Sequence, residues 1–235
     1  MEFKNMSGVY YNTVAPNDYT FFEDLNQIIQ EEPEGFYDAE NLGILRSLGI
    51  VKGKPFKPDA KTKKILIEAE KVAWAMSTAL GFASEAPAAK VYDDRHWEYC
   101  FLTKSPYFEA ESYVELYPRT AFAYQAMTGA KSMVKAVVGA GSQYLTTFKD
   151  KDGEYLDGSK NYKLHILPKV PINNFWSVAV YDTETRSLIN TGRPSATRNS
   201  NMEQLQKNDD GSIDLYFGPD VPASGESNWV KTNVG

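Results

Sequence analysis

Asp182, Thr183 and Arg186 stand directly after an aromatic stretch that contains Trp176 and Tyr181. If Arg186 points back into the sandwich, its guanidinium needs a carboxylate partner, which lies either inside the protein or on a ligand. Asp182 and Thr183 also accept hydrogen bonds from backbone N–H groups, so the sequence DTET is typical of a tight turn between strands. We favour an internal salt bridge of Arg186 over ligand anchoring, because a buried charge is most often paired within its own chain.

His165 completes the set of residues that we predict to bind a ligand, if the chain has such a site. The set is Arg186, Asp182, Trp176, Tyr181 and His165. His165 lies on the polar face of an alternating run, where a half-exposed surface residue is favoured over a catalytic one. The only other histidine, His96, lies in the charged run YDDRHWEYC, where a solvated turn is favoured over an imidazole oriented by Asp93 or Asp94. No catalytic residue is assigned.

Other chemistry is restricted by what the chain lacks. The sequence contains no G-x-S-x-G elbow, no phosphate-binding G-x-x-x-x-G-K-[ST] loop and no H-E-x-x-H motif. Two histidines exclude a multi-histidine metal site, and a site of two histidines and a carboxylate requires the fold to bring them together. Cys100 is the single cysteine, so neither an intrachain disulfide nor a zinc-ligand pair of cysteines can form. We therefore predict no metal and no cofactor.

Aromatic residues make up 13% of the chain and suit either sugar-like ligands or a packed core. One group of them precedes the β-rich half and favours core or interface packing over the mouth of a site: Tyr92, Trp97, Tyr99, Phe101, Tyr107 and Phe108. Glu109, Glu111 and Glu115 lie nearby. A pair of carboxylates held about 5 Å apart would suit glycoside hydrolysis, although helical acids of this kind normally form a solvated face.

The composition of the chain restricts the partners and the cellular compartment that we can predict for it. A formal net charge of −6, with no basic run longer than KTKK at residues 61–64, argues against nucleic acid as a partner. No apolar run approaches the ~20 residues that span a bilayer, so we expect no membrane span. Met1 is followed by charged residues and not by an apolar signal core. The sequence predicts a soluble chain without a signal peptide and leaves its localisation open, including export directed by an upstream segment.

The C-terminal half has the pattern of strands. Residues 161–166 alternate, with Tyr162, Leu164 and Ile166 expected to face the core. Residues 175–181 are aromatic and β-branched, and both faces of that strand are expected to be covered. Further strands are predicted at residues 143–149, 187–191 and 213–217, with turns at Asp-Gly and Gly-Pro pairs, and a long loop is predicted at residues 194–208. The arrangement predicts an antiparallel sandwich of the jelly-roll type.

The N-terminal half has the pattern of helices. Asp18, Asp38 and Asp59 each precede a helical run, and the third run extends from Ala60 to about Leu80. Its expected core stripe is Ile65, Ala69, Val72, Ala73 and Met76. A further helix is predicted near residues 113–127, followed by an irregular connection near Thr128 and Gly129. We therefore predict an α+β protein, with a helical region at residues 1–88 and a β-sandwich domain with an embedded helix at residues 89–235.

Two stretches, YLDGSKNYKLHILPKVPINNFWSVAVYDTETRSL and DGSIDLYFGPDVPASGESNWVKT, resemble the domain-of-unknown-function family 1214. The upstream runs YYNTVAPNDYTFFEDLNQIIQ and LGIVKGKPFKPDAKTKKIL resemble the helical region that separates this family from its usual partner domain, family 1254. The resemblance implies that the chain begins after that partner domain. It also implies that Gly235 precedes an aromatic strand that usually follows NWVKT, so a site shared with the partner domain would be incomplete here.

Three functional hypotheses remain open on the sequence. In the first, which we favour, the chain is a β-sandwich module that binds a partner domain, another subunit or a small amphipathic ligand. In the second, it is a metal-independent hydrolase of a small-molecule, ester or glycoside substrate that uses carboxylates or His165 as acid and base. In the third, it is a subunit of a homo-oligomeric structural assembly, whose open sheet edge is completed by another chain.

Overall fold

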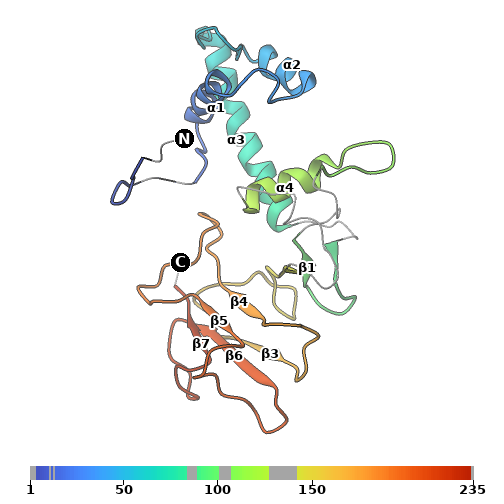
Figure 1. Cartoon of the computed structure of the whole chain (residues 1–235), viewed down its shortest axis with the longest axis vertical. Coiled ribbons are helices and arrows are strands. Elements are labelled where there is room, and N and C mark those ends of the chain that lie inside the picture. Colours follow the sequence, from blue (N-terminus) through green and yellow to red (C-terminus); the bar gives the residue numbers. More distant parts are fainter. Residues whose placement is uncertain are drawn as a thin grey trace. The chain divides into compact units, whose positions relative to one another are not determined.

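The computed structural model describes residues 4–10, 12, 14–83, 89–100, 107–126 and 142–233. The chain divides into two compact units. The helical unit comprises Met1–Ser84 with Arg119–Met127, and the β unit comprises Glu85–Pro118 with Thr128–Gly235. Figure 1 shows helices α1 to α4 and the strands of the β unit. The predicted α+β class is confirmed, whereas the predicted boundary at residue 88 lies outside the described residues.

Helix α2 (Ala39–Ser47) begins after Asp38 as predicted, whereas α1 (Thr20–Glu31) has Tyr19 at its N-cap, where no side-chain capping hydrogen bond forms. The Asp38 side chain accepts a hydrogen bond from the backbone N–H of Asn41, which caps α2. Gly49 follows that helix with a positive φ of 88°, a conformation that glycine adopts without steric cost. The core of the helical unit consists of four buried side chains, Phe22, Ile29, Ile50 and Leu66.

Helix α3 (Ala60–Phe82) is capped by Asp59 as predicted, but its predicted core stripe is wrong. The side that the helix buries carries Leu66, Glu70 and Gly81. The expected stripe is exposed instead: Ile65, Ala69, Val72, Ala73 and Met76. The physical reason is that apolar residues spread over more than one side of α3, so that periodicity alone does not identify the side that packs inward.

Helix α4 (Leu116–Ala126) confirms the helix predicted near residues 113–127. Within the helical unit, Tyr124 of α4 packs edge-on against Trp74 of α3, and the hydroxyl groups of Thr78 and Tyr124 are 3.0 Å apart. Gly81 makes this approach possible, because a Cβ atom at that position would lie 2.8 Å from the Tyr124 ring. The irregular connection predicted near Thr128 and Gly129 lies outside the described residues.

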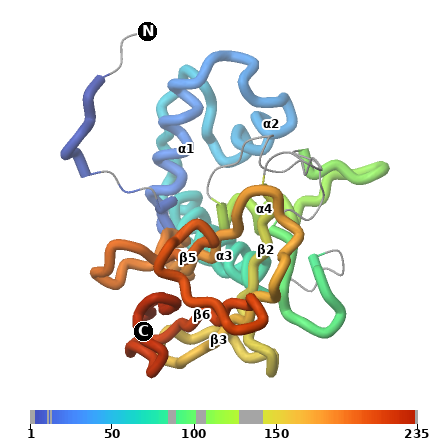
Figure 2. Tube along the Cα trace, turned by 60° about the horizontal axis from the view of Figure 1, so that its bottom comes forward, coloured from blue at the N-terminus to red at the C-terminus, as the bar shows by residue number. Residues whose placement is uncertain are grey.

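The β unit contains three small sheets in the described residues. Strand β1 (Glu98–Tyr99) pairs with β2 (Leu145–Thr146), and β4 (Ser177–Ala179) pairs with β5 (Thr197–Asn199). The central sheet has the order β3-β6-β7, formed by β3 (Tyr162–Ile166), β6 (Ile213–Gly218) and β7 (Trp229–Lys231). Figure 2 shows β3 and β6 side by side. The sheets are mainly antiparallel, as predicted, but β7 runs parallel to β6.

The burial of side chains along each strand tests which of its faces we expected to face the core. Tyr162, Leu164 and Ile166 of β3 are half-buried and alternate with exposed residues, as predicted. The prediction that both faces of the strand at residues 175–181 are covered is wrong. Phe175 and Tyr181, which lie on one side of it, are 53% and 59% exposed. The strand predicted at residues 187–191 is only an isolated bridge between Tyr181 and Leu188, and β5 lies inside the loop predicted at residues 194–208. The jelly-roll arrangement stays a prediction.

Candidate functional site

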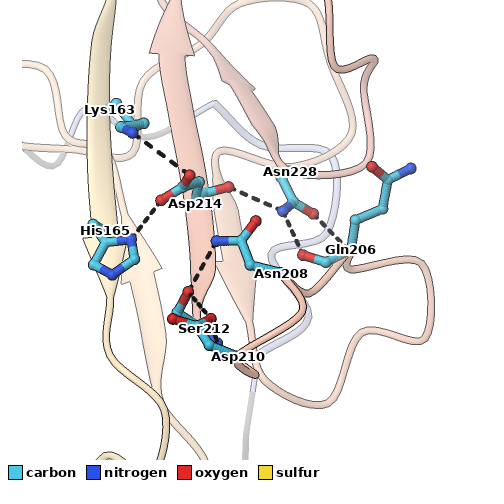
Figure 3. A network of polar contacts seen from close by, with 8 residues as sticks. All are labelled: Lys163, His165, Gln206, Asn208, Asp210, Ser212, Asp214 and Asn228. Carbon is cyan, nitrogen blue, oxygen red and sulfur yellow. Dashed lines mark hydrogen bonds and ion pairs between the residues drawn. The ribbon is translucent and has the colours of Figure 1, made fainter.

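The outward face of the β3–β6 pair gathers polar side chains from two distant parts of the chain. The register of the antiparallel pair places Lys163 opposite Tyr216 and His165 opposite Asp214. Directly opposed residues on one face of a sheet lie within reach of each other. Figure 3 shows Lys163 and His165 of β3 converging on the carboxylate of Asp214 in β6.

Asp214 is the centre of this group. One of its carboxylate oxygens lies 2.6 Å from Nδ1 of His165, and the other lies 3.6 Å from Nζ of Lys163. The hydrogen bond with His165 and the charge of Lys163 hold the pKa of Asp214 below its ordinary value, against the opposing effect of burial. A carboxylate at Nδ1 favours the proton on that nitrogen, which leaves Nε2 as the acceptor of the neutral ring.

One nitrogen of the His165 imidazole is therefore held by Asp214, and the other nitrogen is accessible. His165 is exposed, whereas the Asp214 side chain is largely buried. Among the described residues, Nδ1 of His165 bonds to Asp214 and Nε2 has no hydrogen-bond partner. The Nε2 atom is therefore available to solvent or to a ligand. This arrangement can accept a proton, donate one when the ring is charged, or pair with an anionic oxygen.

A second layer of polar groups fixes β6 in place (Figure 3). The side-chain amide of Asn228 donates hydrogen bonds to the backbone carbonyls of Gln206 and Asp214, at 2.8 and 2.9 Å. Its side-chain oxygen accepts a hydrogen bond from the backbone N–H of Gln206 at 2.8 Å. All polar groups of the Asn228 amide are thus engaged, and the backbone at Asp214 is held from the side opposite the imidazole.

The serine Ser212 lies two positions before Asp214, but its surroundings make it unsuited to nucleophilic attack. Its hydroxyl donates to Asp210 at 2.6 Å and accepts a hydrogen bond from the Asn208 amide at 2.9 Å. The residue is also buried. A nucleophile must reach a substrate and lose its proton to a base, and Asp210 here completes a turn instead.

Two apolar side chains lie next to Lys163, His165 and Asp214. Tyr216 stands beside Lys163 and is half-buried. Leu167 directly follows β3 at the next exposed position after His165 and keeps most of its side chain in solvent. The face therefore carries an ammonium and an imidazole between an aromatic ring and an aliphatic side chain. We call Lys163, His165, Leu167, Asp214 and Tyr216 the β3–β6 face.

The other predicted site residues occupy a different turn. The Asp182 carboxylate accepts hydrogen bonds from the backbone N–H groups of Glu184 and Thr185, at 3.1 and 2.7 Å, so it stabilises its own turn. Arg186 is buried with a positive φ of 57°, and its guanidinium donates to the carbonyl of Glu184 at 2.7 Å. Their role in binding stays a prediction.

Trp176 and Tyr181 flank β4. Trp176 is half-buried, and its backbone N–H bonds to the Ser200 hydroxyl at 3.2 Å. Tyr181 is exposed and forms a bridge with Leu188. The structure thus joins Asp182 and Arg186 in one turn, and joins His165 to Asp214 and Lys163 in the central sheet. Asp214 and Tyr216 escaped the sequence prediction, although the alternation of IDLYFG places both on one face.

The remaining candidates show no organised site among the described residues. Glu109 and Glu111 are exposed, and Glu115 lies 3.3 Å from the hydroxyl of Tyr113. Within the aromatic group, Tyr92 and Tyr107 are exposed, Phe108 is buried and Phe101 lies outside the described residues. His96 packs near Gly153. In the described part of the chain, no cluster of three His, Cys, Asp or Glu residues could hold a metal ion, and no helix combines the length and apolar character of a membrane span.

Residues 141–235, which include the whole β3–β6 face, match the family model described as "Protein of unknown function (DUF1214)". The C-terminal part of the chain is a DUF1214 domain. The resemblance stated from its motifs is therefore confirmed, while the resemblance of the upstream residues to the neighbourhood of family 1254 stays a prediction. Among curated proteins, no relative of the chain was found.

A solved structure similar to this chain is the crystal structure of the VPA0106 protein from Vibrio parahaemolyticus. The two sequences are 15% identical, with a TM-score of 0.42, over 91% of this chain and 48% of that chain. This chain therefore spans about half the length of that protein. The functional argument below uses the DUF1214 domain of this chain alone.

Proposed function

We propose that the DUF1214 domain is a binding module for a small amphipathic molecule that carries a carboxylate or phosphate group. The observation that supports this proposal is the imidazole of His165, which Asp214 orients from one side while its other nitrogen remains accessible beside Lys163. An ammonium and an imidazolium are suitable donors for an anionic oxygen. Tyr216 and Leu167 offer aromatic and aliphatic surface to the apolar part of the same ligand.

Charge determines when such a ligand binds. The carboxylate of Asp214 already offsets one positive charge, so the group is close to neutral when His165 is neutral and carries a net positive charge when the ring gains a proton. Binding of an anion should therefore depend on the ammonium of Lys163 and strengthen when the imidazole carries a proton.

The test is a titration with octanoate followed by the backbone amide and imidazole signals in NMR spectra. Octanol, which lacks the charge, and octylamine, which reverses it, serve as ligand controls. We expect octanoate to shift the signals of residues in β3 and β6, with several-fold weaker binding after Lys163→Ala or His165→Ala. Lys160→Ala is the matched control, because Lys160 is an exposed lysine in the turn before β3. Equal binding by all variants, or equal binding of octanol, would contradict the proposal.

A hydrolase that uses His165 as general base is the second candidate, and the short contact between His165 and Asp214 favours it. In such an enzyme Nε2 of the imidazole takes a proton from water while the Nδ1–H remains bonded to Asp214. Asp214→Asn separates the two candidates. Removal of this negative charge should tighten octanoate binding if the face binds anions. If the face catalyses hydrolysis, the same change should lower turnover of p-nitrophenyl esters to that of His165→Ala.

The third hypothesis, assembly through an open sheet edge, is supported less well than the other two, because the contacts around β7 leave few free backbone groups. The Arg198 guanidinium donates to the carbonyls of Ser227 and Glu226, at 3.0 and 3.2 Å, and to the carbonyl of Trp229. A further strand would need free backbone groups at such an edge. Because Arg198 occupies these carbonyls, we do not include strand addition at β7 in the proposed function.

A further inference from the structure

The turn at residues 208–212, directly before β6, lies against the chain that leaves β3. The backbone N–H of Gly211 donates to the carbonyl of Asn208 at 2.9 Å and closes the turn. A Cβ atom at Gly211 would lie 3.7 Å from the Cβ atom of Pro168, which stands two positions after the end of β3. Figure 3 shows Asp210 in this turn, at the lower end of β6. The turn therefore brings a further carboxylate to one end of the β3–β6 face.

Asp210 is held in position as a carboxylate. One of its oxygens accepts hydrogen bonds from the hydroxyl and the backbone N–H of Ser212, at 2.6 and 2.9 Å. These hydrogen bonds hold the pKa of Asp210 below its ordinary value, and the charge of His165 lowers it further, against the opposing effect of burial. The residue is exposed, so its charge also reaches a ligand in solution. Asp210 therefore places a negative charge within electrostatic reach of the imidazole.

The charges at the β3–β6 face balance when Asp210 is counted with them. Lys163 and a protonated His165 supply two positive charges. Asp214 and Asp210 supply two negative charges. The cost of removing an ion from water rises with the square of its charge, so it is about four times larger for a dianion than for a monoanion. Hydrogen bonds from the ammonium and the imidazolium can compensate a single negative charge, but the face has no excess of positive charge to compensate a second one.

We propose that Asp210 restricts the ligand of the β3–β6 face to amphipathic molecules whose head group carries a single negative charge, such as a carboxylate or a sulfate monoester. This inference rests on the proposed function and narrows it. Phosphate monoesters carry nearly two negative charges at neutral pH, so they are poor ligands of this face. Asp210 is thus a residue that determines specificity, and its own contacts with Ser212 keep it in place for that role.

The first test compares three ligands with the same tail on the full chain at pH 7: octanoate, octyl sulfate and octyl phosphate. Octyl sulfate has the tetrahedral head group of octyl phosphate but only one charge, so it separates the effect of charge from the effect of shape. We expect octanoate and octyl sulfate to shift the NMR signals of residues in β3 and β6, and octyl phosphate to bind at least about fivefold more weakly. Equal affinity for octyl sulfate and octyl phosphate would overturn the inference.

The second test removes the charge of Asp210. In Asp210→Asn the side-chain oxygen can still accept the hydrogen bonds of Ser212, so the turn is preserved. We expect this variant to gain at least about fivefold in affinity for octyl phosphate relative to octanoate. Asp209→Asn is the matched control, because Asp209 is the exposed neighbour and the net charge of the chain changes equally. Its preference should stay within about twofold of wild type, since salt screens more distant charges.

The outcomes distinguish this inference from the proposed function. If none of the three ligands shifts the signals of β3 and β6, the face does not bind anions, and both proposals fail. If octanoate and octyl phosphate bind equally well and both depend on Lys163, the binding module stands and only the role of Asp210 is overturned. An equal change of preference in Asp210→Asn and Asp209→Asn would also overturn it, because the effect would then come from the net charge of the chain.

Discussion

Ser212, directly before β6, and Glu70 of α3 are both polar residues in buried positions, 1% and 6% exposed. Their surroundings differ. The Ser212 hydroxyl has two hydrogen-bond partners, Asp210 and Asn208. Among the described residues, Oε2 of Glu70 has no hydrogen-bond partner, and burial together with the charge of Asp18 raises the pKa of this carboxyl, against a smaller opposing effect of Lys71.

The contrast extends to apolar groups. Strand β6 buries Ile213 and Leu215 in the β unit, whereas α3 leaves Ile65, Val72 and Met76 exposed. Buried polar groups in folded proteins are nearly always hydrogen-bonded, and extended apolar surface usually marks an interaction site. The central sheet of the β unit is thus satisfied by its own residues. Helix α3 departs from both rules among the described residues, through Glu70 and through its exposed apolar stripe.

The largest expected effect tests where the packing energy lies. Leu215→Ala should lower the free energy of unfolding by about 3 kcal/mol, because the side chain is fully buried and its removal leaves a cavity. Val72→Ala on α3 should change the stability of the monomer by less than about 0.5 kcal/mol, since an exposed side chain leaves no cavity. Urea unfolding at low protein concentration measures both. A loss of similar size for Val72→Ala would show that α3 packs on this side within one chain.

Asn228→Ala tests whether the polar network of the β unit is essential. The change removes three hydrogen bonds and leaves the carbonyls of Gln206 and Asp214 without their donor. We expect a loss of about 2 kcal/mol in the free energy of unfolding. Asn201→Ala, at an exposed position, is the control and should stay within about 0.5 kcal/mol of wild type. If both variants unfold at the same urea concentration, the network does not stabilise the sheet.

Local chemistry predicted the elements that need no distant partner. Asp38 and Asp59 accept the capping hydrogen bonds expected of them, and the alternation of β3 gave its buried face correctly. Strands β5 and β7 are three residues long and exist because distant residues pair with them. No local pattern distinguishes such strands from a loop. The inward side of α3 was mispredicted because the most apolar stripe of the helix is not the side that packs inward, which carries Leu66, Glu70 and Gly81.

The candidate site shows the same limit. His165 stood among the predicted residues, but its partner Asp214 is 49 positions away in the sequence. The pairing depends on the register of β3 against β6, because a shift by one residue would turn Asp214 to the other face. Asp182 illustrates the reverse case. Its expected role as a turn residue follows from hydrogen bonds within four residues, and these are present in the structure.

Glu70→Gln tests the unpaired carboxyl of α3. Because the folded pKa of Glu70 lies above its ordinary value of 4.5, the charged form destabilises the helical unit at neutral pH, and this cost disappears as pH falls towards 4.5. We expect Glu70→Gln to raise the stability of the helical unit by about 1 kcal/mol at pH 7 and by much less at pH 4. Circular dichroism at 222 nm follows the helices during urea unfolding.

Glu68→Gln is the control for this prediction, because Glu68 is exposed on the same helix and pairs with Lys71 at 3.2 Å. Its effect on the free energy of unfolding should be small. If Glu70→Gln behaves like Glu68→Gln, Glu70 is solvated, and the contrast between α3 and β6 disappears for polar groups. It would then rest on the exposed apolar stripe alone.

Asp214 should show the opposite dependence on pH, with the smallest effect of the four. Its folded pKa lies below the ordinary value of 3.8, so its interaction with His165 and Lys163 stabilises the β unit above pH 3.8 and is lost as pH falls through the folded pKa. Asp214→Asn should therefore cost about 0.5 kcal/mol at pH 6 and less at pH 2.5. Tryptophan fluorescence during urea unfolding at both values of pH measures the difference. A constant cost at both values would show that Asp214 acts through packing and not through its charge.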